Sequence, residues 1–176
     1  MPAAFTSIAP RGYILGIGTN IDPEINALRI VDHLVARFGR LLVSRMYYTE
    51  PVGMSSHHRF INYCAFAASD QPPEAFKACC EAIEAELGRN RARADSKTAD
   101  RPADIDLLAR LPMARLSAEQ LAGADYLVQP AREIMAMLYA DRFMPVAGDR
   151  LCVLPPLGDA PAAVDRDDRA GLVVIG

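Results

Sequence analysis

Hydrophobic residues recur along this chain with two periods, one typical of strands and one typical of helices. The short apolar run YILGIG at 13–18 is followed by turn-forming residues, which predicts a buried strand. Over 23–38 the apolar positions follow helical spacing until Gly39 ends the run. The same spacing returns over 73–87, where one face is apolar, and this predicts a second helix.

The remaining elements are predicted from β-forming residues and from shorter apolar runs. We predict strands over 41–49, 60–68 and 104–111 and helices near 117–122 and 130–140. The segment DAPAAVDRDDRA at 159–170 is predicted to be an exposed loop that precedes a last apolar run, LVVI.

The order of these elements is β-α-β-β-α-β with a helical addition. This order is typical of an α+β fold with a ferredoxin-like split βαβ antiparallel sheet and helices packed on one face of it. We expect a flexible N-terminus over 1–10, a single domain over 11–158 and a C-terminal tail over 159–176.

Composition and charge narrow the classes of function. The 176 residues carry 19 basic and 22 acidic side chains and a net charge of −3, which argues against a protein that coats nucleic acid. No apolar run approaches the roughly 18 residues that would predict a membrane span, and the start lacks the apolar stretch of a secretory signal. We therefore expect a cytoplasmic protein whose four cysteines are reduced thiols.

Candidate chemistry is concentrated in GRNRARADSKTADRPADIDLL at 88–108. Asp104 and Asp106 lie two apart on a predicted strand, so both carboxylates point to the same side. Two hard oxygen ligands on one face suit Mg²⁺, which binds through one or two carboxylates together with substrate phosphates. The alternative is an edge strand whose acids simply face water.

Basic residues immediately precede this carboxylate pair. Arginine grips phosphate oxygens with a two-pronged fork, so cations beside metal-binding acids can hold a polyphosphate. The alternative is a solvated basic loop. The residues concerned are Arg89, Arg91, Arg93, Lys97 and Arg101.

With these residues in place, the chain resembles the 6-hydroxymethyl-7,8-dihydropterin pyrophosphokinases of folate biosynthesis over roughly residues 13–108. The signature Arg-x-x-Asp-aliphatic-Asp matches Arg101 to Asp106. Four further matches, in the family's order and spacing, are GIGTN at 16–20, YYTEPVG at 47–53, Phe60 with Asn62, and Glu84 with GRNR at 88–91.

The resemblance implies a role for each matching residue. Asp104 and Asp106 are expected to hold two Mg²⁺ ions that bridge the phosphates of ATP. The expected ATP-binding residues are Glu84, Arg89, Arg91, Arg101 and Leu107, with Leu107 against the adenine and with Arg91 and Arg101 as the catalytic pair. The expected pterin-binding residues are Thr49, Val52, Phe60 and Asn62. Without the family order, Phe60 would be interpreted as ordinary core and Asn62 as a strand-end hydrogen bond.

The sequence departs from the family in three places. Asp100 stands where the family has a proline or a small residue, and it puts an acid beside the expected phosphate path. The loop 92–100, expected to close over the ligands, has no tryptophan. After Pro130 the family's histidine is absent, and neither Arg132 nor a nearby aromatic takes the remaining family roles.

The resemblance implies an enzyme that transfers a pyrophosphoryl group from ATP to the hydroxymethyl group of a reduced pterin and releases AMP. The alternative is a pterin- or nucleotide-binding module derived from this enzyme, with weak or no catalysis. An RNA-binding ferredoxin-like domain is excluded because the aromatic strand motif and a basic face are missing. We expect small-molecule partners only, no nucleic acid or membrane, and a monomer or weak homodimer.

Overall fold

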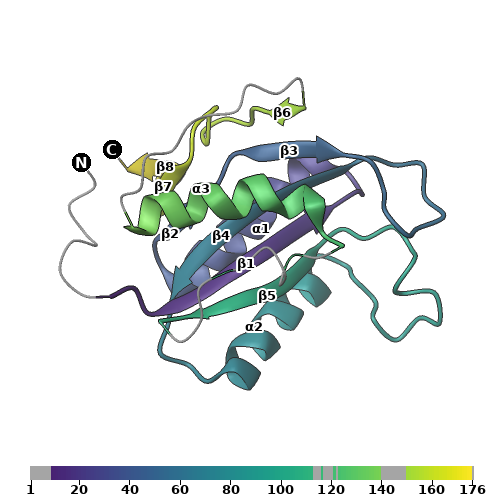
Figure 1. Ribbon diagram of the computed structural model, residues 1–176, viewed down its shortest axis with the longest axis horizontal. Coiled ribbons are helices and arrows are strands. Elements are labelled where there is room, and N and C mark those ends of the chain that lie inside the picture. The colour runs from purple at the N-terminus through teal and green to yellow at the C-terminus, as the bar shows by residue number, and fades with distance from the viewer. Residues whose placement is uncertain (1–8, 113–115, 117–120, 122, 140–149, 176) are drawn as a thin grey trace.

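The computed structural model describes residues 9–112, 116, 121, 123–139 and 150–175. In this part of the chain, strands and helices are interspersed, with runs of consecutive strands after the first and the last α-helix (Figure 1). The helices are α1 (Pro23–Phe38), α2 (Pro73–Glu86) and α3 (Val128–Tyr139), with the 3-10 helix η2 (Asp125–Leu127) directly before α3. The strands are β1 (Gly12–Thr19), β2 (Leu41–Val43), β3 (Met46–Thr49), β4 (Phe60–Ala68), β5 (Asp104–Leu111), β6 (Leu151–Cys152), β7 (Ala162–Asp167) and β8 (Gly171–Ile175).

The strands form one sheet in the order β5-β1-β4-β2-β7-β8, with β3 pairing to β4 and β6. Every pairing between these strands is antiparallel. The prediction of an α+β fold with an antiparallel sheet is therefore confirmed. The central strands β1 and β4 are paired along their whole length, from Gly12 beside Ala68 to Thr19 beside Ile61.

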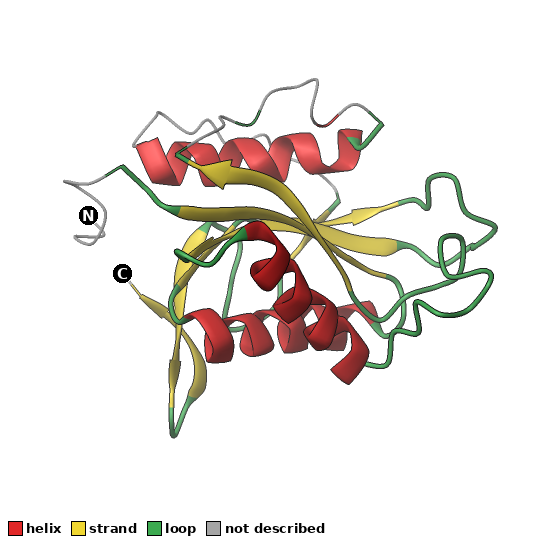
Figure 2. Ribbon diagram, turned by 90° about the horizontal axis from the view of Figure 1, so that it is seen from below, coloured by secondary structure: helices red, strands yellow, loops and turns green. Residues whose placement is uncertain are grey.

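Helices α1 and α2 cover one face of the sheet and α3 covers the other (Figure 2). The prediction that the helices pack on one face is therefore wrong for α3. The reason lies in the central strands, which are apolar on both faces and so need cover on both. Along β1, Leu15 belongs to the cluster on the α1 side, whereas its neighbour Ile14 belongs to the cluster on the α3 side.

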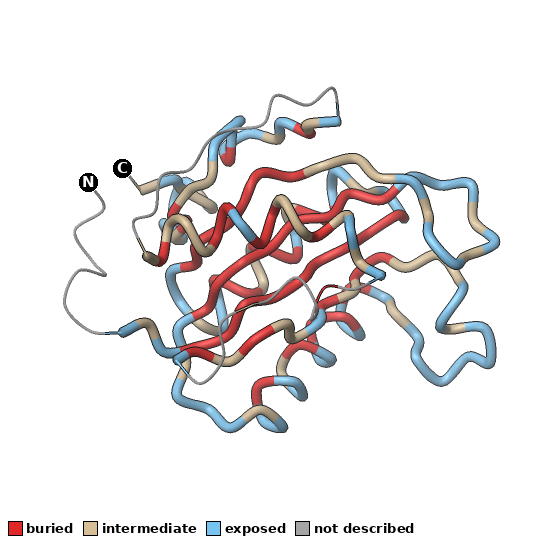
Figure 3. Tube along the Cα trace, in the orientation of Figure 1, coloured by how far each residue is buried: buried red, intermediate tan, exposed pale blue. Residues whose placement is uncertain are grey.

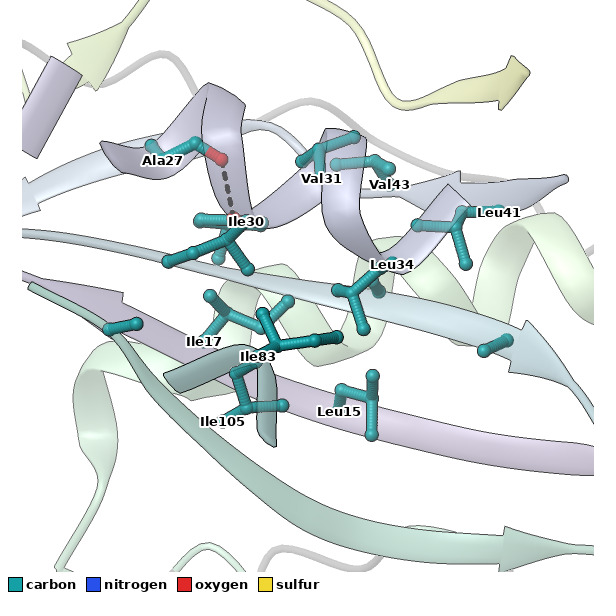
Figure 4. Packing of buried hydrophobic residues seen from close by; sticks show 14 of the residues in the cluster. Leu15, Ile17, Ala27, Ile30, Val31, Leu34, Leu41, Val43, Ile83 and Ile105 are labelled. Carbon is teal, nitrogen blue, oxygen red and sulfur yellow. Dashed lines mark hydrogen bonds between the residues drawn. The ribbon is translucent and has the colours of Figure 1, made fainter. Parts of the chain in front are cut away.

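The larger core lies between the sheet and helices α1 and α2 (Figure 4). Ile30 and Leu34 of α1 and Ile83 of α2 are fully buried against the sheet residues Leu15 and Ile17. Burying an aliphatic side chain of this size contributes about 1.5–3 kcal/mol, so this face supplies much of the hydrophobic stabilisation. The helix predictions over 23–38 and 73–87 are confirmed to within one residue.

The strand predicted over 41–49 is interrupted between β2 and β3, at Ser44 and Arg45. There the Ser44 hydroxyl accepts a hydrogen bond from the Cys64 backbone amide at 2.9 Å, and so replaces a carbonyl in the ladder. The Arg45 amide donates instead to the carboxylate of Glu133 on α3 at 2.7 Å. The side chain of Ser44 and the buried charge of Glu133 thus break the strand, and propensity alone does not predict this.

The segment 159–170, predicted to be an exposed loop, contains β7, and this prediction is wrong. Strand β7 pairs with β2 through Val164 beside Leu41, and Val164 is fully buried. The charged residues in the segment hid a short apolar stretch that completes the sheet. Of the remaining predictions, the helix near 117–122 and the first eight residues of the flexible N-terminus lie outside the described residues.

Two long loops leave the same end of the sheet, namely 50–59 between β3 and β4 and 87–103 between α2 and β5 (Figures 1 and 3). Most of their residues are exposed, in contrast to the buried strands beside them. Strand pairing brings Gly18 of β1 beside both Asn62 of β4 and Asp104 of β5 at this end. The register therefore gathers the candidate residues of three distant segments.

Candidate active site

A pocket of about 180 Å³ opens at this end of the sheet. Its walls come from β1, the start of β4, β5, both loops and η2. The lining residues are Gly16, Ile17, Gly18, Glu50, Val52, Met54, Phe60, Asn62, Lys97, Arg101, Asp104, Asp106, Tyr126 and Leu127. Six of the residues with an expected ligand-binding role meet in this pocket, and Lys97 of the basic loop lines it as well. The six are Val52, Phe60, Asn62, Arg101, Asp104 and Asp106.

The two aspartates of β5 differ in their electrostatic surroundings. Burial alone would raise the pKa of Asp104, but the charges and hydrogen bonds of Arg89 and Arg101 outweigh it and lower the pKa. The pKa of Asp106 is raised, by desolvation first and then by the negative charges of Asp104 and Glu84. Asp106 therefore carries a poorly compensated charge, and a bound cation would relieve it.

Two arginines hold Asp104 in place. Arg89 donates to one carboxylate oxygen, and Arg101 donates to the other at 2.6 Å. Both guanidiniums are largely buried, and within the described residues the Nε atoms of Arg89 and Arg101 have no hydrogen-bond partner. The Arg101 side chain lines the pocket, and a guanidinium beside an open pocket is suited to an anionic ligand such as a phosphate.

Glu84 on α2 forms ion pairs with Arg91 and Arg89. It is 1% exposed, accepts two hydrogen bonds from Arg91 at 2.7 and 2.9 Å, and accepts a third from the Ile105 amide at 2.7 Å. Gly88, at a positive φ of 97°, ends the helix and turns the chain back so that these contacts form. The side chain of Arg91 remains 45% exposed and lies 3.8 Å from the Asp104 carboxylate.

On the other side of the pocket, Asn62 is fixed by its neighbours. Its amide nitrogen donates to the Thr49 hydroxyl at 2.5 Å, and the side chain is almost fully buried. A methyl group on Gly18 would lie 2.6 Å from the Asn62 amide oxygen, so only glycine leaves room for this side chain. Phe60, 7% exposed, lines the pocket beside it. An aromatic face next to a fixed amide is suited to a flat heterocycle with a polar edge.

Five of the expected ligand-binding residues do not line the pocket. Glu84, Arg89 and Arg91 form the ion-pair cluster behind Asp104, and Thr49 is one hydrogen bond away through Asn62. Leu107 is farther removed. It packs against the core on the α1 side, because neighbours along a strand point to opposite faces and Asp106 points into the pocket.

Sequence reasoning missed Tyr126, which lines the pocket from η2. Its pKa is raised by burial and by the negative charges of Asp104 and Asp106. No local pattern marks this tyrosine. The position of η2 depends on the adjoining α3, which packs on the same face of the sheet. Gly16, the first residue of the family match at 16–20, also lines the pocket, as expected of a glycine within a strand that allows a close approach. Added carbon at Gly16 would lie 2.8 Å from Leu127.

Asp100 does not line the pocket, and its carboxylate binds Asn20 and His58. One carboxylate oxygen accepts from the Asn20 amide at 2.7 Å, and the other lies 2.7 Å from Nδ1 of His58. Hydrogen bonds from Ser56, Asn20 and His58 lower the pKa of Asp100 against the opposing effect of burial. Replacing this residue would therefore break contacts between two loops, and would not only remove a negative charge near the arginines.

A carboxylate pair, an arginine and an aromatic face beside a fixed amide thus meet in one pocket, and this arrangement is suited to a phosphate-containing ligand and a flat heterocycle. The chain belongs to the 7,8-dihydro-6-hydroxymethylpterin-pyrophosphokinase (HPPK) family, which it matches over residues 14–136. The prediction of this family is thereby confirmed.

Two named relatives are also similar to this chain in sequence. The 2-amino-4-hydroxy-6-hydroxymethyldihydropteridine pyrophosphokinases of two Porphyromonas gingivalis strains are each 32% identical to this chain over 136 residues. Each match covers 72% of this chain and 92% of the relative. Within the described residues, none of the helices has the length and apolar character needed to span a bilayer.

Proposed function

We propose that this chain is a 2-amino-4-hydroxy-6-hydroxymethyldihydropteridine diphosphokinase. It transfers the pyrophosphoryl group of ATP to the hydroxymethyl group of 6-hydroxymethyl-7,8-dihydropterin in folate or related pterin biosynthesis, and it releases AMP. The observation that carries the proposal is that Asp104 and Asp106 share one pocket with Phe60 and Asn62, in a chain of this family.

The residues present fit Mg²⁺. Asp104 and Asp106 supply two carboxylates on one face of β5, and the raised pKa of Asp106 reports a negative charge that a cation would offset. Within the described residues, no cluster of three or more protein ligands is present. A site with two carboxylates suits Mg²⁺, which retains several bound waters and also binds phosphate oxygens of the substrate. When bound, two ions would neutralise the charge that builds up on the phosphates.

The arginines bind and orient the triphosphate. Arg101 lines the pocket, Arg89 lies behind Asp104, and Arg91 extends from Glu84 with nearly half of its side chain exposed. Arg91 and Arg101 stabilise the charge that is redistributed in the transition state. Leu107 is proposed to contact the adenine, as the family resemblance implies.

Phe60 and Asn62 orient the pterin. Phe60 stacks on the ring, Asn62 pairs with its polar edge, and Thr49 and Val52 contact it from the adjoining strand and loop. Tyr126 supplies a second aromatic side chain in the same pocket. We assign it this role because it lies in η2, directly before α3, and lines the pocket together with Asp104 and Asp106.

In the transfer step, the hydroxymethyl oxygen forms a bond to the β-phosphorus, and the bond from that phosphorus to the oxygen bridging to the α-phosphorus breaks. AMP departs with the bond's electron pair, and the hydroxyl proton passes to water. No side-chain nucleophile is needed, so catalysis rests on positioning and charge stabilisation. The alternative of a binding module without catalysis is less favoured, because the metal-type carboxylates and all three arginines are in place.

We also propose that the ferredoxin-like arrangement describes the core of the fold, since β5-β1-β4-β2 is the order expected of a split βαβ unit. The proposed domain spans 11–158, with β7 and β8 of the 159–176 segment joined to the sheet edge. We propose that the chain acts as a monomer or weak homodimer.

Incubation with ATP, Mg²⁺ and 6-hydroxymethyl-7,8-dihydropterin tests the proposal. We expect AMP and the pterin pyrophosphate in equal amounts, and no AMP when either Mg²⁺ or the pterin is omitted. Pterin binding measured by calorimetry without AMP release would favour the binding module. Release of ADP in place of AMP would contradict pyrophosphoryl transfer.

A further inference from the structure

The two loops beside the pocket are joined through one carboxylate. Asp100 belongs to the loop 87–103, and its two oxygens bind Asn20 at the end of β1 and His58 in the loop 50–59. An ionised carboxylate only accepts hydrogen bonds, so the Nδ1–H of His58 is the donor. Ser56 adds to the junction. Its hydroxyl accepts from the His58 amide at 3.0 Å and lies 3.4 Å from the Asn20 amide nitrogen.

Asn20 fixes the other end of this junction. It is 3% exposed, its backbone amide donates to the Arg101 carbonyl at 3.1 Å, and its side-chain oxygen accepts from the Arg101 amide at 2.8 Å. Arg101 then reaches Asp104 through its guanidinium at 2.6 Å. A continuous set of hydrogen bonds therefore runs from His58 through Asp100 and Asn20 to the arginine that holds a proposed metal ligand.

The loop 50–59 has few other attachments. Most of its residues between Pro51 and Arg59 are exposed, including Val52, which lines the pocket. A loop with little buried apolar surface takes its position from its polar contacts. Near the middle of the loop, Met54 also lines the pocket and lies 3.9 Å from an Arg101 nitrogen. The position of the loop 50–59, which is proposed to contact the pterin, thus depends on Arg101, which is proposed to bind the phosphates.

We propose that Asp100 is a positioning residue that couples the two ligand subsites, by joining the pterin loop 50–59 to Asn20 and Arg101. The proposal rests on the proposed function, because it assigns the two ligands to those subsites. When phosphates order Arg101, the loop is drawn into place for the pterin, and binding of the pterin orders Arg101 in return. Such coupling is reciprocal by thermodynamic necessity.

Calorimetry with the full chain tests this coupling. The affinity for 6-hydroxymethyl-7,8-dihydropterin is measured without and with a saturating, non-hydrolysable ATP analogue and Mg²⁺, and the ratio of the two affinities is the coupling factor. We expect a wild-type factor of about fivefold or more, which is the usual lower range for coupled sites. We expect Asp100→Ala to bring the factor close to unity, while its affinity for the ATP analogue alone stays close to wild type.

Matched variants separate coupling from a general structural role. Asp95→Ala is the control, since Asp95 lies in the same loop, is 54% exposed and pairs only with Arg93 among the described residues. It should keep the wild-type factor. His58→Ala should lower the factor, and combining it with Asp100→Ala should add little, because both act through one contact. Asp100→Asn, which keeps the size of the side chain, should give an intermediate factor and serves if the alanine variant does not fold.

Several results would overturn the proposal. They are a wild-type factor near unity, a wild-type factor in Asp100→Ala, or the same loss in Asp95→Ala. Additive losses for His58 and Asp100 would also contradict it. The proposed function fails separately, if wild-type protein binds both ligands with coupling and yet releases no AMP.

Discussion

Two buried glutamates make the same kind of ion pair on opposite faces of the sheet, and they differ in what surrounds their arginine. Glu133 on α3 is fully buried and binds Arg45, which is 6% exposed. Glu84 on α2 is 1% exposed and binds Arg91, whose side chain is 45% exposed. The two carboxylates are equally hidden, but only the second arginine reaches solvent.

On the α3 face the pair is closed. Arg45 donates to Glu133 through its amide at 2.7 Å and its Nε at 3.0 Å, its Nη2 lies 2.9 Å from the same carboxylate, and the Tyr47 hydroxyl donates as well. These contacts join α3 to the break between β2 and β3. Both charged side chains are buried and neither lines the active-site pocket, so we interpret this cluster as structural.

On the α2 face the pair is open. Glu84 uses its oxygens to aim Arg91 towards Asp104, and the pKa of Asp106 is raised by desolvation and by the negative charges of Asp104 and Glu84. In this protein, the buried ion pair that belongs to the candidate site is the one whose arginine side chain is partly exposed near the pocket. Burial of the carboxylate alone does not distinguish the two cases.

Replacing the two arginines breaks this comparison most strongly. We expect Arg45→Met to lower the free energy of unfolding by about 3–5 kcal/mol, because Glu133 is left as a buried charge. KM and kcat of the folded fraction should change little. Arg91→Met should instead lower kcat by about 100-fold or more, as expected for loss of a group that stabilises transition-state charge. Urea unfolding and steady-state kinetics at low temperature measure both. Equal losses of stability in the two variants would remove the distinction.

The two aspartates sharpen the comparison within the open site. We expect Asp104→Ala and Asp106→Ala each to lower kcat/KM by about 100- to 1000-fold at saturating Mg²⁺, since each removes a carboxylate at the phosphates. Their stabilities should differ. Asp104→Ala leaves Arg89 and Arg101 without their partner and should cost about 1–3 kcal/mol. Asp106→Ala removes a repulsion and should be as stable as wild type or more stable. Near-normal turnover by either variant would contradict the metal assignment.

Asn62 allows a smaller, ligand-specific test. We expect Asn62→Ala to weaken pterin binding by about 1–3 kcal/mol, because polar atoms of the heterocycle lose their partner, and to leave ATP-analogue binding nearly unchanged. Gly18→Ala should imitate this loss, since the added methyl would displace the Asn62 amide oxygen. Calorimetric titrations with each ligand check both variants. Equal weakening for the two ligands would show that Asn62 is only structural.

The smallest effect concerns a buried thiol beside each glutamate. Burial, aided by Glu133, raises the pKa of Cys64, and burial, aided by Glu84, raises that of Cys80 to about 12. A raised pKa means that the folded state keeps its proton after the unfolded state loses it near pH 9.0. Stability is therefore complete below this pH and falls above it, by about 1 kcal/mol per thiol at about pH 9.5.

Urea unfolding across an alkaline pH series measures this fall. Cys64→Ala and Cys80→Ala should each flatten the curve, whereas Cys79→Ala, at a half-buried position, should not. A curve that is flat for wild-type protein up to about pH 10 would show that neither thiol is held protonated by the fold.

The sequence by itself determined the elements with strong periodicity and the site residues that follow from local spacing. Helices α1 and α2 were predictable because their apolar faces repeat over many residues. Asp104 and Asp106 were predictable as a pair because neighbours two apart on a strand share a face. The family resemblance added Phe60 and Asn62, which no spacing rule would have connected with β5.

Only the tertiary structure decided which partners these residues have. Glu133 broke the strand expected over 41–49, and β7 joined the sheet despite its charged neighbours. Asp100 binds His58, 42 positions earlier in the chain. Tyr126 reaches the pocket because η2 directly precedes α3 and packs with it on one face of the sheet. Periodicity records how a segment is buried. Contacts between distant segments depend on register and on shared desolvation, which form only when the sheet and its two helical layers come together.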